Sequence, residues 1–160
     1  MKKETIENFN LLSPKFERDN IQLGLSRIKE ALGVLNHPCK NIPAVQIVGT
    51  NGKGSITAFI ENILYAEKIN IGVTTSPHLL DICERIRVNK GNINREEFES
   101  LFNKIENNLS TNKLSPFEKI ICCALKFFDL KKIEKNLSSY NLSPFEQIIC
   151  CALKFFDLKK

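Results

Sequence analysis

Apolar residues recur at intervals of three and four along much of the chain, which is the spacing of one face of an α-helix. The first such stretch predicts a helix from about Gly24 to Leu35, with apolar residues at positions 21, 25, 28, 32 and 35. Residues 56–68 predict a second helix, with a buried stripe of Ile56, Phe59, Ile60, Ile63 and Leu64. A third helix begins after Asn94, a good N-cap with Glu97 at the capping-box position, and its apolar face is Phe98, Leu101, Phe102 and Ile105.

Two short apolar runs lack this spacing and predict β-strands at residues 44–48 and 70–74. With the helix between them they make a strand–helix–strand unit of about thirty residues, which predicts a parallel pair with a right-handed crossover. We therefore expect an α/β fold with an incomplete parallel sheet and flanking helices. A sheet of only two parallel strands is not stable unaided and leaves open edges.

A glycine-rich turn joins the first predicted strand to the second helix and consists of Gly49, Thr50, Asn51, Gly52, Lys53, Gly54 and Ser55. Its glycines let backbone N–H groups approach a phosphate, and the helix that follows adds a favourable dipole. Lys53 can reach the outer phosphates of a nucleotide, and Ser55 can ligate a magnesium ion. In the common Walker A loop a Ser or Thr follows the Lys directly, whereas Gly54 intervenes here. The alternative is an ordinary glycine-rich turn, but the order of strand, loop and helix favours a phosphate site.

The segment after the second predicted strand contains Ser76, Pro77 and His78. Ligands of open α/β sheets bind beyond the carboxyl ends of the strands, so we expect this segment to face the same crevice as the glycine-rich turn. Ser76 could be a second hydroxyl ligand to magnesium, and His78 could either contact phosphate or cap the turn. Arg85 and Arg87 could clamp an anion, although a charged surface loop is the favoured interpretation.

Composition limits the classes of function. The 160 residues suffice for one domain with or without a tail. Residues 105–160 supply +3 of the net charge of +5, and their lysines are interleaved with apolar residues, which favours solvated helix faces over nucleic-acid binding. No run approaches the ~20 apolar residues of a membrane span, and the start lacks a signal peptide, so we expect a cytoplasmic protein without membrane contact. The six cysteines form no C-x-x-C pair and predict buried thiols, and His37 is expected to be a loop residue.

The end of the chain is a repeat: residues 105–132 are followed directly by a second copy at 133–160, and from Leu114 onward the copies differ only in Lys119 and Gln147. Two copies favour a tandem duplication over a solenoid, which needs three or more units. Each copy predicts a helix with Pro at its first position and a wide apolar face, comprising in the first copy Phe117, Ile120, Ile121, Cys123, Ala124, Leu125, Phe127 and Phe128. Such helices require burial on more than one side, so the copies are expected to pack on each other or on another chain.

Four stretches together resemble the folylpolyglutamate synthase and dihydrofolate synthase family of the Mur ligase group. They are residues 21–28, the phosphate loop at 48–55, residues 75–79 with 84–86, and residues 114–118. Their order and spacing match that family across residues 21–130. The resemblance implies residues 1–132 as an ATP-binding domain of the Mur ligase central type, followed by the duplicate helical tail at 133–160.

The resemblance also implies a reaction: ATP phosphorylates a carboxylate of folate or dihydropteroate, and the amine of L-glutamate attacks the acyl phosphate. It assigns ATP binding to residues 49–55, with Lys53 in the catalytic role, and magnesium binding to Ser76 with Ser55 beside it. It places the pteroate or folate near Ser115, Pro116, Phe117 and Glu118.

The family continues beyond these motifs into a strand with a glutamate that binds magnesium, a histidine ligand, a modified lysine and a C-terminal domain. Those motifs do not occur in the 160 residues. The expectation from the sequence is therefore a shortened ligase with a weak or absent phosphate site. The alternative is a catalytically inactive nucleotide-binding fragment or a helical interaction fragment.

Overall fold

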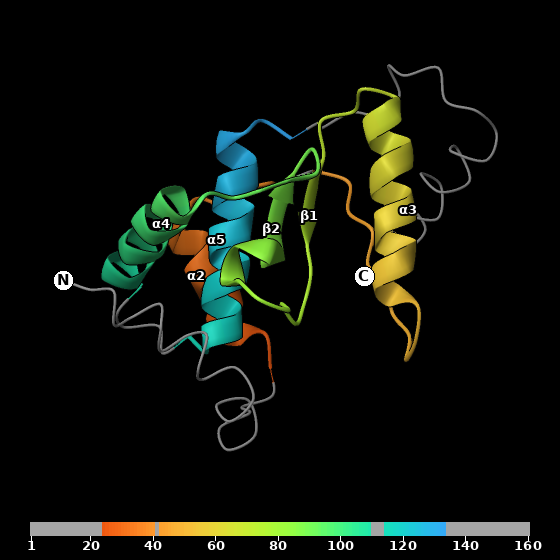
Figure 1. Ribbon diagram of the computed structural model, residues 1–160. Coiled ribbons are helices and arrows are strands. Elements are labelled where there is room, and N and C mark those ends of the chain that lie inside the picture. Colours follow the sequence, from red (N-terminus) through yellow and green to blue (C-terminus); the bar gives the residue numbers. More distant parts are fainter. Residues whose placement is uncertain (1–23, 41, 110–113, 134–160) are drawn as a thin grey trace.

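The computed structural model describes residues 24–40, 42–109 and 114–133 (Figure 1). These residues form an α/β fold, which confirms the predicted fold class. The helices are α2 (Ser26–Val34), α3 (Lys53–Ala66), η1 (Ile82–Arg85, a 3-10 helix), α4 (Arg95–Asn108) and α5 (Pro116–Leu130), and the strands are β1 (Gly72–Thr74), β2 (Ile86–Val88) and β3 (Gly91–Asn92).

The sheet is antiparallel, in the order β1-β2-β3, with Gly72 opposite Val88 and Val88 opposite Gly91. The predicted strand at 44–48 does not form, and its expected parallel pairing with residues 70–74 was wrong. Antiparallel strands need only a short connection, whereas a parallel pair is less stable per residue and is normally buried on both faces. The described residues supply no cover for such a pair, and Val48 is 81% exposed.

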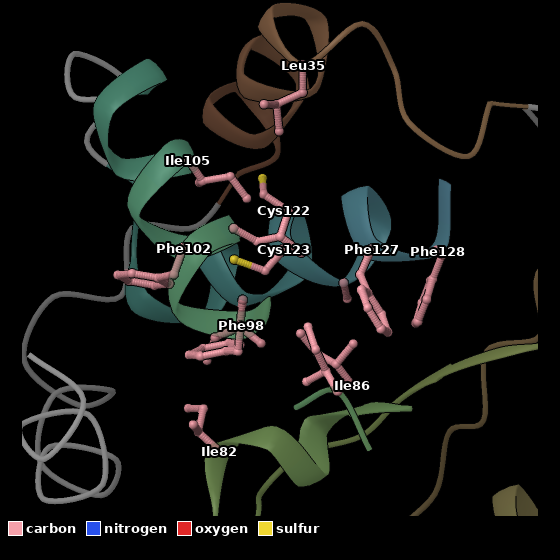
Figure 2. Close-up of a cluster of buried hydrophobic side chains, with 14 of the residues drawn as sticks. Leu35, Ile82, Ile86, Phe98, Phe102, Ile105, Cys122, Cys123, Phe127 and Phe128 are labelled. Atoms are coloured by element: carbon pink, nitrogen blue, oxygen red, sulfur yellow. The ribbon is translucent and has the colours of Figure 1, made fainter. Parts of the chain in front are cut away.

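The core lies between α4 and α5, with α2 and the sheet packed around this pair (Figure 2). The apolar face predicted for residues 98–105 is fully buried there, which confirms the pattern. The wide face of α5 is buried against α4, α2 and β1, as expected of a helix that is apolar on more than one side. Ile121 and Leu125 of this face are half-buried, and Phe117 is 45% exposed in the first turn.

Helix α3 stands apart from α2, α4 and α5 (Figure 1). Its predicted buried stripe was wrong: Ile56 is 48% exposed and Phe59 is 69% exposed, while the other three members are half-buried. The stripe was expected to pack against a parallel sheet that the described residues do not form. None of the helices formed by the described residues combines the length and apolar character that a transmembrane span requires.

Thiols are part of the core, as the cysteine pattern predicted. Cys83, Cys122 and Cys123 are buried and form no disulfide. Burial raises the pKa of Cys122 to about 11 and that of Cys83 to about 12, the latter with a contribution from the nearby Asp81. These thiols are therefore protonated and unreactive at neutral pH while the core is closed.

A close approach of β1 to α5 depends on Gly72. A Cβ added there would lie 2.6 Å from Cδ1 of the Phe128 ring, which is closer than non-bonded carbon atoms approach. We expect Gly72→Ala to lower the free energy of unfolding by about 1–3 kcal/mol, because overpacking forces the ring or the strand to shift. Urea unfolding measures this loss. Gly91→Ala is the matched control, since its Cβ would make only an ordinary contact at 3.5 Å and should leave stability nearly unchanged.

Candidate functional site

The glycine-rich turn leads directly into α3, which begins earlier than the sequence predicted. Gly52 is its N-cap, with φ of 76°, a left-handed conformation that favours glycine. The first helical hydrogen bond runs from the Ile56 N–H to the Gly52 carbonyl at 2.9 Å. The N–H groups of Lys53, Gly54 and Ser55 therefore precede the helical ladder, and such groups are the usual ligands of anions at a helix N-terminus.

The side chain of Lys53 folds back over this turn. Its Nζ donates to the carbonyl oxygens of Gly49 at 2.7 Å and Thr50 at 3.0 Å. The ammonium group thus lies within the bend, next to the positive end of the α3 dipole, and both favour an anion at that point. Residues 50–55 are exposed, so the turn is accessible to a ligand from solvent.

The segment that follows β1 is held by Glu84. Its carboxylate accepts hydrogen bonds from the backbone N–H groups of Leu79, Leu80 and Asp81, at 2.8, 3.0 and 2.9 Å. These bonds, led by the one from Leu79, hold the pKa of Glu84 below its usual value. The sequence analysis did not assign this role to Glu84, although a carboxylate three residues after the N-cap Asp81 is a capping-box signal.

His78 contacts Arg85, a partner that the sequence did not indicate, and its roles in phosphate contact and turn capping stay predictions. Its Nδ1 accepts a hydrogen bond from Arg85 Nε at 2.9 Å, and burial together with the Arg85 charge lowers the pKa of His78. The ring is therefore neutral at pH 7, with the proton on Nε2. Arg85 is only 3% exposed, so the interpretation of this stretch as a charged surface loop was wrong at that position.

Arg87 also has a structural partner rather than an anion. Its guanidinium pairs with the carboxylate of Glu61 on α3, with Nη2 2.8 Å from Oε2 and Nε 3.3 Å from Oε1. It also contacts Thr75 Oγ1 at 3.5 Å. Glu61 is the buried residue of α3, so this bidentate pair ties the helix that carries the phosphate loop to β2 and to the segment before Ser76.

We expect Glu61→Gln to loosen α3 without unfolding the core, because it removes one charge of a pair that is mostly buried on the Glu61 side. Allowing for the exposure of Arg87, a loss of about 1–2 kcal/mol is expected, which corresponds to roughly tenfold faster amide exchange in α3. Hydrogen–deuterium exchange measures this effect. Glu67→Gln, just after the same helix, is the control, and equal acceleration in both variants would contradict the role of the Glu61–Arg87 pair.

Residues 115–118 form the N-terminus of α5. Ser115 Oγ accepts from the Glu118 N–H, and the Glu118 carboxylate accepts from the Ser115 N–H at 2.8 Å and from Arg27 Nη2 at 3.3 Å. Burial alone would raise the pKa of Glu118, but these hydrogen bonds outweigh it and lower the pKa. The structure thus gives Ser115, Pro116 and Glu118 a capping function, while Phe117 faces solvent; a contact with pteroate stays a prediction.

The predicted magnesium ligands are the hydroxyl groups of Ser55 and Ser76. Among the described residues, no three His, Cys, Asp or Glu side chains lie together in a way that could hold a metal ion. Ser55 and Ser76 are exposed hydroxyls. A magnesium ion that arrives with nucleotide phosphates needs only one or two protein oxygens, so these hydroxyls fit a nucleotide-borne metal better than a metal bound by protein alone.

Comparison with curated proteins points to one group of enzymes. The chain is 34% identical over 110 residues to the dihydrofolate synthetase of Saccharomyces cerevisiae and 35% identical over 114 residues to the dihydrofolate synthase/folylpolyglutamate synthase of Bacillus subtilis. Each alignment covers 68% of this chain but only 26% of the relative. The chain therefore spans about a quarter of the length of these relatives. No protein-family model matches the sequence.

Solved structures agree with the sequence relatives. One of them is a bifunctional folylpolyglutamate synthase/dihydrofolate synthase from Yersinia pestis, complexed with AMPPNP and Mn ion. The match covers 80% of this chain and 31% of the Yersinia chain, with a TM-score of 0.69 and 31% identity. A bifunctional synthase of the same name with Mn, AMPPNP and L-glutamate bound matches with a TM-score of 0.67 and 32% identity. The fold is therefore part of a Mur-ligase-like domain. By both comparisons, the chain belongs to the family of folylpolyglutamate and dihydrofolate synthases.

Proposed function

We propose that this chain provides the ATP-phosphate site of a ligase that joins L-glutamate to folate or dihydropteroate through an acyl phosphate. The observation that carries this proposal is the position of the Lys53 ammonium within the bend of the glycine-rich turn, at the N-terminus of α3. Both solved synthase structures described above hold AMPPNP and Mn, and one also holds L-glutamate, which supports the same ligand classes here.

The proposed chemistry assigns a task to each part of the turn. A free carboxylate is a poor electrophile, so a phosphoryl group must be installed on it before the amine of glutamate can attack. Lys53 and the N–H groups that precede the α3 ladder would bind and orient the ATP phosphates and offset their charge. Mg²⁺ bound with the nucleotide would supply further charge neutralisation, with Ser55 and Ser76 as the proposed protein ligands.

The acceptor is proposed to lie near residues 115–118. Phe117 is the exposed aromatic residue of this segment and offers an apolar face for a pterin ring, while the capping box of Ser115 and Glu118 fixes its position. We keep both dihydropteroate and folate as acceptors. The proposed division of the chain is residues 1–132 as the nucleotide-binding part and residues 133–160 as the duplicated tail, in a cytoplasmic protein.

A second candidate function is nucleotide binding without turnover. It is favoured by the exposure of Ile56 and Phe59 on α3, since the described residues do not form the sheet that was expected to cover this helix. Self-association through the repeated helices is a further proposal, and light scattering at several protein concentrations measures it. Neither proposal requires a change in the glycine-rich turn, and neither requires that this chain perform ligation by itself.

Two measurements separate these functions. Isothermal titration with Mg–AMPPNP and with Mn–AMPPNP tests the phosphate site, and saturable binding is expected; no binding at millimolar nucleotide contradicts the proposal. Release of ADP or phosphate in the presence of ATP, L-glutamate and dihydropteroate or tetrahydrofolate then tests ligation. Turnover supports the ligase, whereas binding without turnover supports the second candidate.

A further inference from the structure

Helix α5 occupies a groove whose walls are α4, α2 and β1. Figure 2 shows its side chains pointing into the cluster formed by these elements. At its N-terminus Glu118 pairs with Arg27 of α2, and near its C-terminus the Phe128 ring lies against Gly72 of β1. The residues of α5 that are buried in this groove are Glu118, Ile120, Cys122, Cys123, Ala124, Phe127 and Phe128.

Every one of these buried residues occurs again 28 positions later in the sequence. The repeats lie in residues 134–160, which are outside the described residues, and they are Glu146, Ile148, Cys150, Cys151, Ala152, Phe155 and Phe156. The cap residues Ser115 and Pro116 recur as Ser143 and Pro144. The single difference between 114–132 and 142–160 is at Lys119, which lies outside the buried set and pairs with Glu106 at 2.7 Å.

We propose that residues 142–160 are a second occupant of the α5 groove, so that the two copies exchange within one chain. The groove recognises its occupant through apolar side chains, one capping box and the Glu118–Arg27 pair, and the second copy carries all of these groups. A fold with one groove and two equivalent helical sequences has two states that differ little in packing. When one copy is in the groove, the other is displaced from it.

Two differences favour the first copy. The connection from Leu109 to Leu114 comprises residues 110–113, whereas the connection to Leu142 comprises residues 110–141, about eight times as long; loop-closure entropy then favours the first copy about twentyfold. Gln147 cannot form the ion pair that Lys119 makes with Glu106, and a partly exposed pair of this kind contributes a factor of roughly one to five. The second copy is therefore expected in the groove in about 1–5% of molecules.

Thiol labelling of the native protein tests the exchange. Cys122 and Cys123 lie in the core, so a thiol reagent modifies them only when α5 leaves the groove. The two copies are distinguished by mass spectrometry of peptides that include position 119 or 147. Without exchange, global unfolding sets the protection of Cys122 and Cys123 against labelling. Exchange predicts a smaller protection of about 20–100-fold, which is the ratio of molecules with the first copy in the groove to molecules with the second copy in it.

The decisive variant is Phe155→Asp, which disables the second copy and leaves every described residue unchanged. If the copies exchange, it removes the competitor, and protection of Cys122 and Cys123 increases at least severalfold. Unchanged protection in Phe155→Asp overturns the proposal. The same result at protein concentrations a hundredfold apart supports exchange within one chain, whereas a concentration-dependent effect overturns it in favour of insertion from a second copy of the chain.

Phe127→Asp is the matched variant in the first copy. Exchange predicts that it folds through the second copy, with a folding equilibrium constant lowered by about the 20–100-fold that separates the occupants and with Cys150 and Cys151 now protected. The double variant Phe127→Asp/Phe155→Asp should lose at least another hundredfold. Equal losses in Phe127→Asp and in the double variant, measured by urea unfolding, would contradict exchange.

Discussion

Replacing Phe98 with Ala is expected to lower the free energy of unfolding by about 3–5 kcal/mol, which is a large fraction of the stability of an ordinary domain. Phe98 is 0% exposed and comes from the face of α4 that packs on α5. Its ring also stacks on Phe102, with ring centroids 5.8 Å apart. The substitution therefore removes a large buried surface and leaves a cavity that the surrounding helices cannot close fully.

Phe59→Ala is the matched control for this prediction. Phe59 belongs to the apolar stripe of α3 and is 69% exposed, so its loss should change stability by about 0.5 kcal/mol or less. The two substitutions delete the same atoms from two helices of equal length, and urea unfolding compares them directly. Similar losses in both variants would show that α3 is covered as the sequence pattern predicted, in contradiction to the structure.

The contrast between Phe98 and Phe59 also shows how far sequence reasoning reaches. Helices were predicted well, since their spacing and caps are local: Asn94 accepts from the Glu97 N–H at 2.7 Å, and α5 begins with Pro116 at its first position, both as predicted. Whether an apolar stripe is buried depends on what packs against it. That partner is non-local, so the pattern identified the face of α3 correctly and its burial incorrectly.

The strand at 44–48 failed for the same physical reason. An apolar run indicates extended backbone in a sheet only where a neighbouring strand offers hydrogen-bond partners, and among the described residues β1 pairs with β2 alone. Register and direction of pairing are set by such tertiary competition. The sequence therefore predicted the α/β class from its order of elements but not the antiparallel sheet.

At the candidate site, the residue types were easier to predict than their partners. The conformation of Gly52 and the position of Lys53 agree with a loop shaped for an anion. Arg87 is occupied by Glu61, 26 residues away, and no local pattern indicates a pair at that separation. An arginine near a proposed phosphate site is thus as compatible with a structural ion pair as with anion binding, and only the fold distinguishes these roles.

The second large effect is expected at Lys53. Lys53→Met should weaken binding of Mg–AMPPNP by about 10–100-fold, because a charge-assisted hydrogen bond to phosphate contributes roughly 1.5–3 kcal/mol. In the structure the ammonium bonds to two loop carbonyls, so binding requires that it exchange those partners for phosphate oxygens over a short distance. Isothermal titration of both proteins under the same salt conditions measures the ratio of dissociation constants.

Lys104→Met on the exposed side of α4 is the matched control, since it removes the same charge far from the phosphate loop along the chain. It should leave affinity within about twofold, because screened surface charges contribute little at physiological salt. Lys53 is exposed, and its side-chain hydrogen bonds to Gly49 and Thr50 remain within its own loop, so its replacement should also leave urea unfolding unchanged within about 0.5 kcal/mol. A Lys53→Met protein that keeps both its stability and its nucleotide affinity would overturn the proposed role of Lys53, since the helix N-terminus alone would then account for binding.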